Sequence, residues 1–257
     1  MFRRFDRRLA RIGVGLAGLL AFGQALSVSA RQAAPATAKE VVARHVTAMG
    51  GEAAFKAIKS IRARGTFSMV AQGVSGEFEL LAARPNKMVL RVTVTGIGRI
   101  ESGYDGKVGW SIDPVSGPTV MKGRQLSETA DDAVFDAPLH GSDHVKELAL
   151  VGNEEFDRRK AIKIKVVFQS GNEQAEFFDA ETGLQIGSEG PRETPMGVVP
   201  TIGILRDYKK FQTLQMPTTL VQRVLGIEQV MQISSYEFDV VPPEAFDLPP
   251  AIKALIK

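Results

Sequence analysis

Between residues 60 and 238 the sequence consists largely of short runs in which apolar and polar side chains alternate. In the clearest run, Ile162, Ile164 and Val166 alternate with Lys163 and Lys165. The runs occupy residues 61–69, 77–80, 88–94, 99–104, 107–113, 118–123, 146–152, 160–169, 174–179, 184–190, 201–211, 217–225 and 227–238. A period of two with Gly, Pro and Asn between the runs predicts about twelve antiparallel strands, each with one apolar face.

Helical signals are few. Thr37 and Glu40 form a capping box and Gly50-Gly51 supplies a stop, so a helix is expected over residues 38–49. Further helices are expected over residues 52–59 and 127–139, with short helical turns in the C-terminal segments PPEAF and PPAIKALIK.

A sheet of this size cannot leave its apolar face open to water, so it must curl, pair with a second sheet or close around something. Because the chain offers one long helix and a few short ones, we expect a mainly β (α+β) fold. In this fold a single curved antiparallel sheet holds the helices in its concavity. Such a sheet encloses a hydrophobic cavity wherever the helices fail to fill it.

The N-terminus has the three parts of a secretory signal peptide. Five arginines precede an apolar run from Ile12 to Leu26, and Val28 and Ala30 are the small residues that a signal peptidase requires. The run is short for a membrane span of about 20 residues, which makes a retained anchor the weaker alternative. We therefore predict cleavage after Ala30, a linker over residues 31–37, and one exported domain over residues 38–257, in the periplasm or, alternatively, secreted.

Charge and cysteine content exclude several functions. The leader holds five of the 32 basic and one of the 29 acidic residues, which leaves 27 and 28 in residues 31–257. With no basic excess in the mature chain, a nucleic-acid partner is not expected. The absence of cysteine excludes disulfides, thiolate metal sites and cysteine nucleophiles.

Catalytic motifs are missing. The sequence contains no nucleophile elbow, no P-loop and no dinucleotide-binding fingerprint, so no catalytic residue and no cofactor is predicted. His45 lies on the apolar stripe of the first helix and is interpreted as a half-buried structural histidine. His140, Asp143 and His144 are interpreted as parts of a solvated loop; a metal site there is the weaker alternative, on which an exported enzyme would depend.

Four local strings resemble the periplasmic outer-membrane lipoprotein carriers typified by LolA and their lipoprotein-sorting relatives. The most telling string, Tyr104 to Trp110 followed by Asp113-Pro114, places an Asp-Gly turn before a strand with one large aromatic residue. The others are Gly76 to Arg91, Phe178 to Leu184, and Asp207-Tyr208 followed by Gln215-Met216-Pro217. Their order behind a leader and an opening helix extends the resemblance over residues 38–248.

The resemblance implies an unclosed, incomplete β-barrel of 11–12 strands around a few helices, with a cavity for lipid or lipoprotein acyl chains. It further implies membrane-bound loading and receiving proteins, a monomer, and no enzymatic activity. The residues that we predict to line the cavity are Phe67, Met69, Phe78, Leu80, Met88, Leu90, Val92, Trp110 and Ile112. The alternative is that these side chains pack against the helices and leave no cavity.

Two features depart from the family. The carriers hold their lid with an arginine of an early strand, whereas Arg62 and Arg64 alternate with the apolar residues and are expected on the opposite face. The segment from Glu189 to Pro200 is long and rich in Pro and Gly. Both departures suggest a divergent member, and an envelope protein-interaction or sensor module on the same fold is the alternative function.

Overall fold

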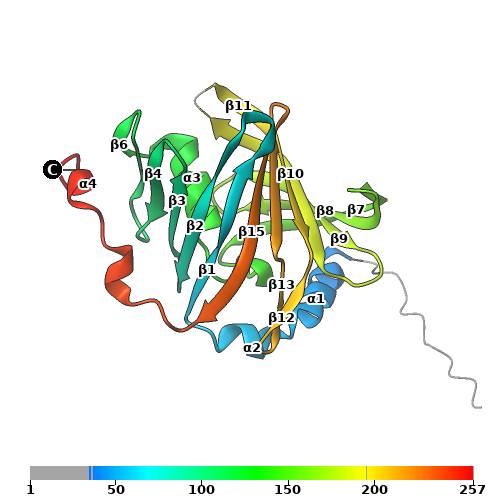
Figure 1. Ribbon diagram of the computed structural model, residues 1–257. Helices are drawn as coiled ribbons and strands as arrows, with labels where there is room; N and C mark the ends of the chain where they lie inside the picture. Colours follow the sequence, from blue (N-terminus) through cyan, green and yellow to red (C-terminus); the bar gives the residue numbers. More distant parts are fainter. Residues whose placement is uncertain (1–34, 36, 195, 257) are drawn as a thin grey trace, which may run out of the picture. The chain divides into compact units, whose positions relative to one another are not determined.

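One antiparallel sheet dominates the computed structural model, which describes residues 35, 37–194 and 196–256 (Figure 1). Within these residues, thirteen strands follow the order β6-β5-β4-β3-β2-β1-β15-β14-β11-β10-β9-β8-β7, and β12 and β13 form a separate hairpin. The strands are β1 (Ser60–Met69), β2 (Val74–Ala83), β3 (Lys87–Val94), β4 (Gly98–Tyr104), β5 (Gly109–Asp113), β6 (Gly117–Val120), β7 (Val145–Phe156), β8 (Arg159–Phe168), β9 (Glu173–Asp179), β10 (Gln185–Thr194), β11 (Gly197–Arg206), β12 (Lys209–Phe211), β13 (Leu214–Met216), β14 (Thr219–Val224) and β15 (Ile227–Phe238). Since β6 and β7 lie at opposite edges, the sheet does not close, and the predicted fold class is confirmed.

The opening helix has the bounds that its local signals predict. Helix α1 (Ala38–Met49) begins at a complete capping box between Thr37 and Glu40. It ends at Gly50, where φ is +121° and a β-carbon would lie 2.3 Å from the carbonyl oxygen of Thr213. Glycine is therefore required both by the backbone angle and by the close approach of the β12–β13 hairpin. Helix α2 (Glu52–Lys56) follows directly.

Helix α3 differs from its predicted bounds of 127–139. It spans Gly123–Asp132 and is followed by a separate 3-10 turn, Ala137–Leu139. No side chain caps its start, so the sequence offers no signal there. Three residues beyond its end the chain makes a distant contact, in which the backbone N–H of Phe135 donates to the carbonyl of Pro85 at 2.9 Å.

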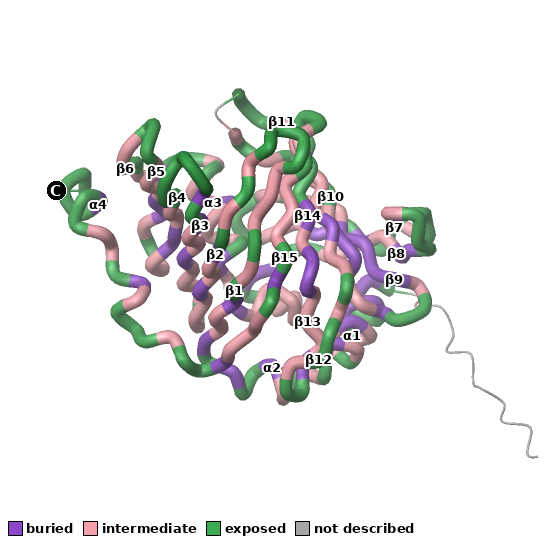
Figure 2. Tube along the Cα trace, viewed as in Figure 1, coloured by how far each residue is buried: buried purple, intermediate pink, exposed green. Residues whose placement is uncertain are grey.

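Helices α1, α2 and α3 cover one face of the sheet, which we call the inner face. On this face α1 buries Val41 and Val42 against Ile162, Ile164 and Phe178. Near the other end, Phe55 of α2 packs with Phe135 and with Leu214 of the β12–β13 hairpin. Figure 2 shows the buried residues concentrated in the lower part of the molecule, around α1, α2 and the strands beside them.

The opposite face, which we call the outer face, is also apolar in two places, so the prediction of one apolar face per strand is incomplete. Trp110 packs with Leu81 and Val89 beneath Phe246 and Ile252. These last two residues belong to the C-terminal 3-10 turn (Pro243–Phe246) and helix α4 (Pro250–Lys253).

The second apolar layer of the outer face lies over β8–β11. Phe156 stacks on Phe177 with ring centroids 4.0 Å apart, and both pack with Ile204. A β-carbon on Gly187 would lie 2.5 Å from the ring of Phe156, so glycine is needed for this approach. The sheet thus curls onto itself on this side.

The leader predicted at residues 1–30 lies outside the described residues, and of the linker only residues 35 and 37 are described. In the part of the chain that the structure describes, no helix is both long and apolar enough to cross a bilayer.

Candidate ligand cavity

The inner face of β1–β3, β14 and β15 carries large apolar side chains that the helices do not fully cover. Strand register places Phe67 opposite Met231, Leu80 opposite Leu90, and Leu220 opposite Met231. All five side chains are only partly buried, although they pack around the buried residues Ala63, Phe78 and Ile233. Partial exposure on the covered side of a sheet indicates open space beneath the cover.

Helix α3 crosses this space. It contacts β4 and β5 on one side and β10 on the other. Of its ten described residues Glu128 alone is buried, so the helix contributes little apolar area to the core.

Polar contacts hold α3 to β10. The carboxylate of Glu128 accepts from Arg124 Nε at 2.6 Å and from the backbone N–H of Glu193 at 3.0 Å. Arg192 donates from both terminal nitrogens to Asp132, at 3.0 and 2.7 Å. Burial lowers the pKa of Arg192, but the charge and hydrogen bonds of Asp132 outweigh it and hold this pKa above its usual value, so the guanidinium stays charged.

A cavity of about 440 Å³ lies under α3, at the tips of the strands. This volume falls within the range of small-molecule sites. Its walls come from the end of β1, from α3 and from strands β10, β11, β14 and β15. The lining residues are Met69, Gln125, Glu128, Thr129, Asp132, Arg192, Glu193, Thr194, Met196, Thr201, Gln222, Val224, Leu225, Ile227 and Gln229.

The cavity wall carries apolar and polar levels along β14 and β15. Nearest the tips, Val224 faces Ile227, and both line the cavity. Two residues further along, Gln222 faces Gln229, which also line it. After another two residues Leu220 faces Met231, on the same face of the sheet but beyond the lining residues.

One polar group of the cavity wall lacks a hydrogen-bond partner among the described residues. Thr201 is 6% exposed, and its buried hydroxyl oxygen makes no hydrogen bond within the described residues. A buried hydroxyl without a partner is unfavourable by about 1–3 kcal/mol, so this position favours a ligand or water that supplies one.

The nine residues predicted to line the cavity do not all lie on the same face of the sheet. Met69 lines the cavity, and six others share the inner face with it: Phe67, Phe78, Leu80, Met88, Leu90 and Val92. Trp110 and Ile112 pair with Gly103 and Glu101, which puts them on the outer face beneath the C-terminal segment. Their placement on the cavity face was wrong, because alternation shows that a strand has two faces but not which one another segment covers.

The polar wall was missed by sequence reasoning. Gln222 and Gln229 flank the turn between β14 and β15 on inner-face positions, and this break in apolar alternation was the available signal. Arg192 lies in the segment from Glu189 to Pro200 that departs from the family pattern, and Thr201 follows this segment directly. Both residues belong to the β10–β11 hairpin.

The histidines are structural. His45 is buried, as a histidine on an apolar stripe should be, and its Nδ1 accepts from the backbone N–H of Gln185 at 3.1 Å. Burial lowers the pKa of His45 to about 4, so the ring is neutral near pH 7.

The prediction of a solvated loop at His140 and His144 was wrong. The His140 side chain is 3% exposed and its Nε2 lies 2.7 Å from Oε2 of buried Glu176. Burial disfavours the imidazolium, but the charge and hydrogen bond of Glu176 outweigh it and raise the pKa of His140. His144 is buried against the ring of Phe168. Within the described residues, no group of three or more His, Asp or Glu side chains is placed to hold a metal ion.

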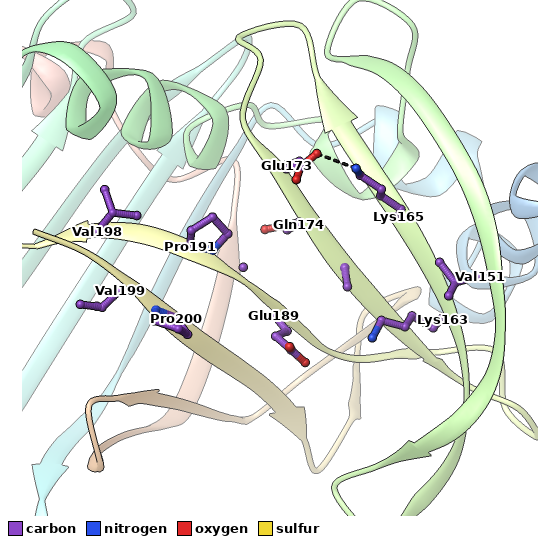
Figure 3. A pocket seen from close by; sticks show the side chains of 12 residues that line it. Val151, Lys163, Lys165, Glu173, Gln174, Glu189, Pro191, Val198, Val199 and Pro200 are labelled. Carbon is purple, nitrogen blue, oxygen red and sulfur yellow. Dashed lines mark ion pairs between the residues drawn. The ribbon is translucent and has the colours of Figure 1, made fainter.

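A second hollow lies on the outer face, over β7–β11 (Figure 3). Its volume is about 450 Å³, and its walls include Val151, Ala175, Pro191, Val198 and Pro200. Lys163 and Lys165 alternate with Ile162 and Ile164, which face α1, so the hollow and the helices lie on opposite sides of the sheet. In Figure 3 Lys165 reaches Glu173, with the two charged atoms 2.7 Å apart.

Three solved structures share the fold over nearly their whole lengths. A DUF1329 family protein from Desulfovibrio piger is 11% identical, with a TM-score of 0.54, over 82% of this chain and 95% of that chain. A LolA superfamily protein from Nitrosomonas europaea is 12% identical, with a TM-score of 0.54, over 83% and 99%. A domain described as an outer membrane lipoprotein-sorting protein, from Vibrio parahaemolyticus, is 11% identical, with a TM-score of 0.51, over 81% and 95%.

No protein-family model and no curated protein matches the sequence. At these low identities the likeness to the solved structures concerns the fold. The chain has the LolA-like fold, and the resemblance drawn from the four local strings is confirmed at that level.

Proposed function

We propose that this LolA-like chain is a non-enzymatic periplasmic carrier that binds the acyl chains of a lipid or lipoprotein in its inner-face cavity. The single observation that carries the proposal is the partial exposure of Phe67, Leu80, Leu90, Leu220 and Met231 on the helix-covered side of the sheet. A fold that had no ligand to hold would fill this side with helix side chains.

The energetics of carrying a lipid through water favour such an interior. Exposure costs about 0.8 kcal/mol per CH₂, so a sixteen-carbon chain left in water costs roughly 12 kcal/mol. A carrier must replace this burial with side chains of its own. Met69 and Met231 are suited to the task, because the flexible thioether adapts to chains of different shape.

Helix α3 is the element that we propose to open. Its contacts with β10 are ion pairs and hydrogen bonds, which water can replace at little net cost, whereas apolar burial fixes α1. Membrane-bound proteins that load and unload the cargo, and a monomeric carrier between them, belong to this proposal.

Mass spectrometry of organic extracts tests the proposal. The chain is purified from a periplasm without detergent, as wild type and as Leu90→Arg, which places a charge on the inner face. We expect a stoichiometric acyl lipid in the wild type and its loss in folded Leu90→Arg. Val151→Arg, on the outer face, is the matched control and retains the lipid. A folded wild type that carries no lipid, and takes none up from vesicles, contradicts the proposal.

The outer hollow favours a second candidate function, the binding of a protein partner. Val151 and Val198 are 58% and 54% exposed on its walls, and apolar walls of this kind take side chains of a partner. Under this alternative Val151→Arg abolishes binding to envelope proteins while Leu90→Arg leaves it intact. The two variants therefore separate the two functions.

A further inference from the structure

Polar side chains in the wall of the inner-face cavity restrict which head groups the cargo can carry, provided that the proposed lipid-binding function holds. Gln222, Gln229 and Thr201 contribute two side-chain amides and one hydroxyl to the wall. Amides and hydroxyls both donate and accept hydrogen bonds. The buried hydroxyl of Thr201 has no partner in the described part of the chain.

The charged groups of the wall oppose an anionic head group. Three carboxylates line the cavity, from Glu128, Asp132 and Glu193. Among the described lining residues the sole cation is Arg192, and both of its terminal nitrogens already donate to Asp132. A phosphate or carboxylate entering here meets an excess of negative charge and a guanidinium that is already engaged.

Apolar side chains lie on both sides of the amides. Val224 and Ile227 line the cavity nearer the strand tips, and Leu220 and Met231 follow further along the inner face. An amphiphile whose chain packs against these side chains can place its polar end at the amides and at Thr201, beneath α3.

We infer that the cavity selects amphiphiles whose polar end is uncharged and carries hydroxyl or amide groups, and that Thr201, Gln222 and Gln229 bind this polar end. Asp132 acts in this selection by engaging Arg192 and by adding negative charge. The inference rests on the proposed lipid-binding function and names its substrate class.

Displacement of a fluorescent probe tests the inference. The mature chain is loaded with N-phenyl-1-naphthylamine, an apolar dye whose fluorescence rises in apolar surroundings. Two ligands of equal chain length, monopalmitoylglycerol and palmitate, are then titrated at pH 8 below their micellar concentrations. We expect the uncharged ligand to displace the dye at a concentration at least about tenfold lower than palmitate, which corresponds to about 1.4 kcal/mol.

Two variants link the preference to named residues. Thr201→Val keeps the side-chain shape and removes the hydroxyl, and together with Gln222→Leu it is expected to weaken the binding of monopalmitoylglycerol more than the binding of palmitate. Asp132→Asn weakens the hold on Arg192 and removes one negative charge, and it is expected to strengthen the binding of palmitate. If the role of Asp132 were only structural, the variant would weaken the binding of both ligands together.

The outcomes separate the inference from the proposed function. If the dye binds and palmitate displaces it as well as monopalmitoylglycerol does, the head-group inference is overturned and the lipid-binding function stands. If neither the dye nor either ligand binds the folded wild type, both are overturned.

Discussion

Helices α1 and α3 lie on the same face of one sheet but are held there by different forces. Helix α1 buries Ala38, Val41, Val42, His45 and Met49, and a complete capping box fixes its start. Helix α3 buries Glu128 alone among its ten residues, has no side-chain cap and is joined to β10 by ion pairs and hydrogen bonds. Apolar burial makes α1 a permanent part of the core, while the polar contacts of α3 can exchange with water. This difference supports the proposal that α1 stays in place as a support and that α3 is the movable cover.

The largest expected effect is on α1. Val41→Asp places an unpaired charge in the core that α1 forms with β8 and β9, and it is expected to lower the free energy of unfolding by more than about 4 kcal/mol. Ala43→Asp adds the same charge to the exposed side of the same helix and should change the free energy of unfolding by less than about 0.5 kcal/mol. Denaturant titration measures the free energy of unfolding of both variants. Equal effects would show that α1 is not part of the core.

The pH dependence of α1 is the next effect in size. Burial lowers the pKa of His45 from 6.5 to about 4, so the folded state binds fewer protons than the unfolded state between these values. The contribution of neutral His45 to the free energy of unfolding is complete above pH 6.5 and is lost as the pH falls toward 4. The loss reaches about 3 kcal/mol, at 1.36 kcal/mol per pKa unit. His45→Gln should remove this slope from denaturation curves recorded between pH 4 and 7. An unchanged slope would assign it to other groups.

His140 provides a control of opposite sign. Glu176 raises its pKa, so its contribution is complete below pH 6.5 and is lost as the pH rises through the folded value. His140→Gln should therefore affect the stability curve on the alkaline side of pH 6.5, where the slope from His45 is absent.

A smaller global effect is expected at α3. Glu128→Ala leaves Arg124 and the backbone N–H of Glu193 without their acceptor, at a cost of about 1–3 kcal/mol that falls mainly on local opening. Amide hydrogen exchange should accelerate over residues 123–132 and stay unchanged over 38–49. Equal acceleration of both helices would contradict the distinction between support and cover.

The smallest effect is expected on the outer face of β1. Arg64 is half exposed and pairs with Glu79 and Glu237, so Arg64→Ala should cost no more than about 1 kcal/mol. Because this face is opposite α3, the variant should leave the rate of lipid release unchanged. Faster release, measured by dye displacement, would assign this arginine a part in closing the cavity.

The difference between α1 and α3 also explains which elements could be predicted from the sequence. The bounds of α1 follow from Thr37, Glu40 and Gly50, which are neighbours along the chain, and the strands follow from alternation. The turn after α3 includes a hydrogen bond from the backbone N–H of Phe135 to the carbonyl of Pro85, about fifty residues away in the chain, and no local pattern predicts it.

Long-range contacts also account for the errors at the candidate site. Trp110 and Ile112 alternate like residues of the inner face, but a segment more than 130 residues further along the chain, containing Phe246 and Ile252, covers their side of the sheet. His140 reads as a loop residue until Glu176 is brought beside it. By contrast, Phe67, Met69 and Leu90 share one face of the sheet, because their alternation is continuous across β1–β3, and their role in lining a ligand cavity stays a prediction.

Photo-crosslinking tests the central claim most directly. Monopalmitoylglycerol with a diazirine near the end of its chain is bound to the mature protein, irradiated and mapped by peptide mass spectrometry. The account predicts saturable labelling at Phe67–Met69 and Leu220–Met231, on the inner face. Labelling confined to Val151 and Val198–Pro200 on the outer face, or labelling that does not saturate, would contradict it.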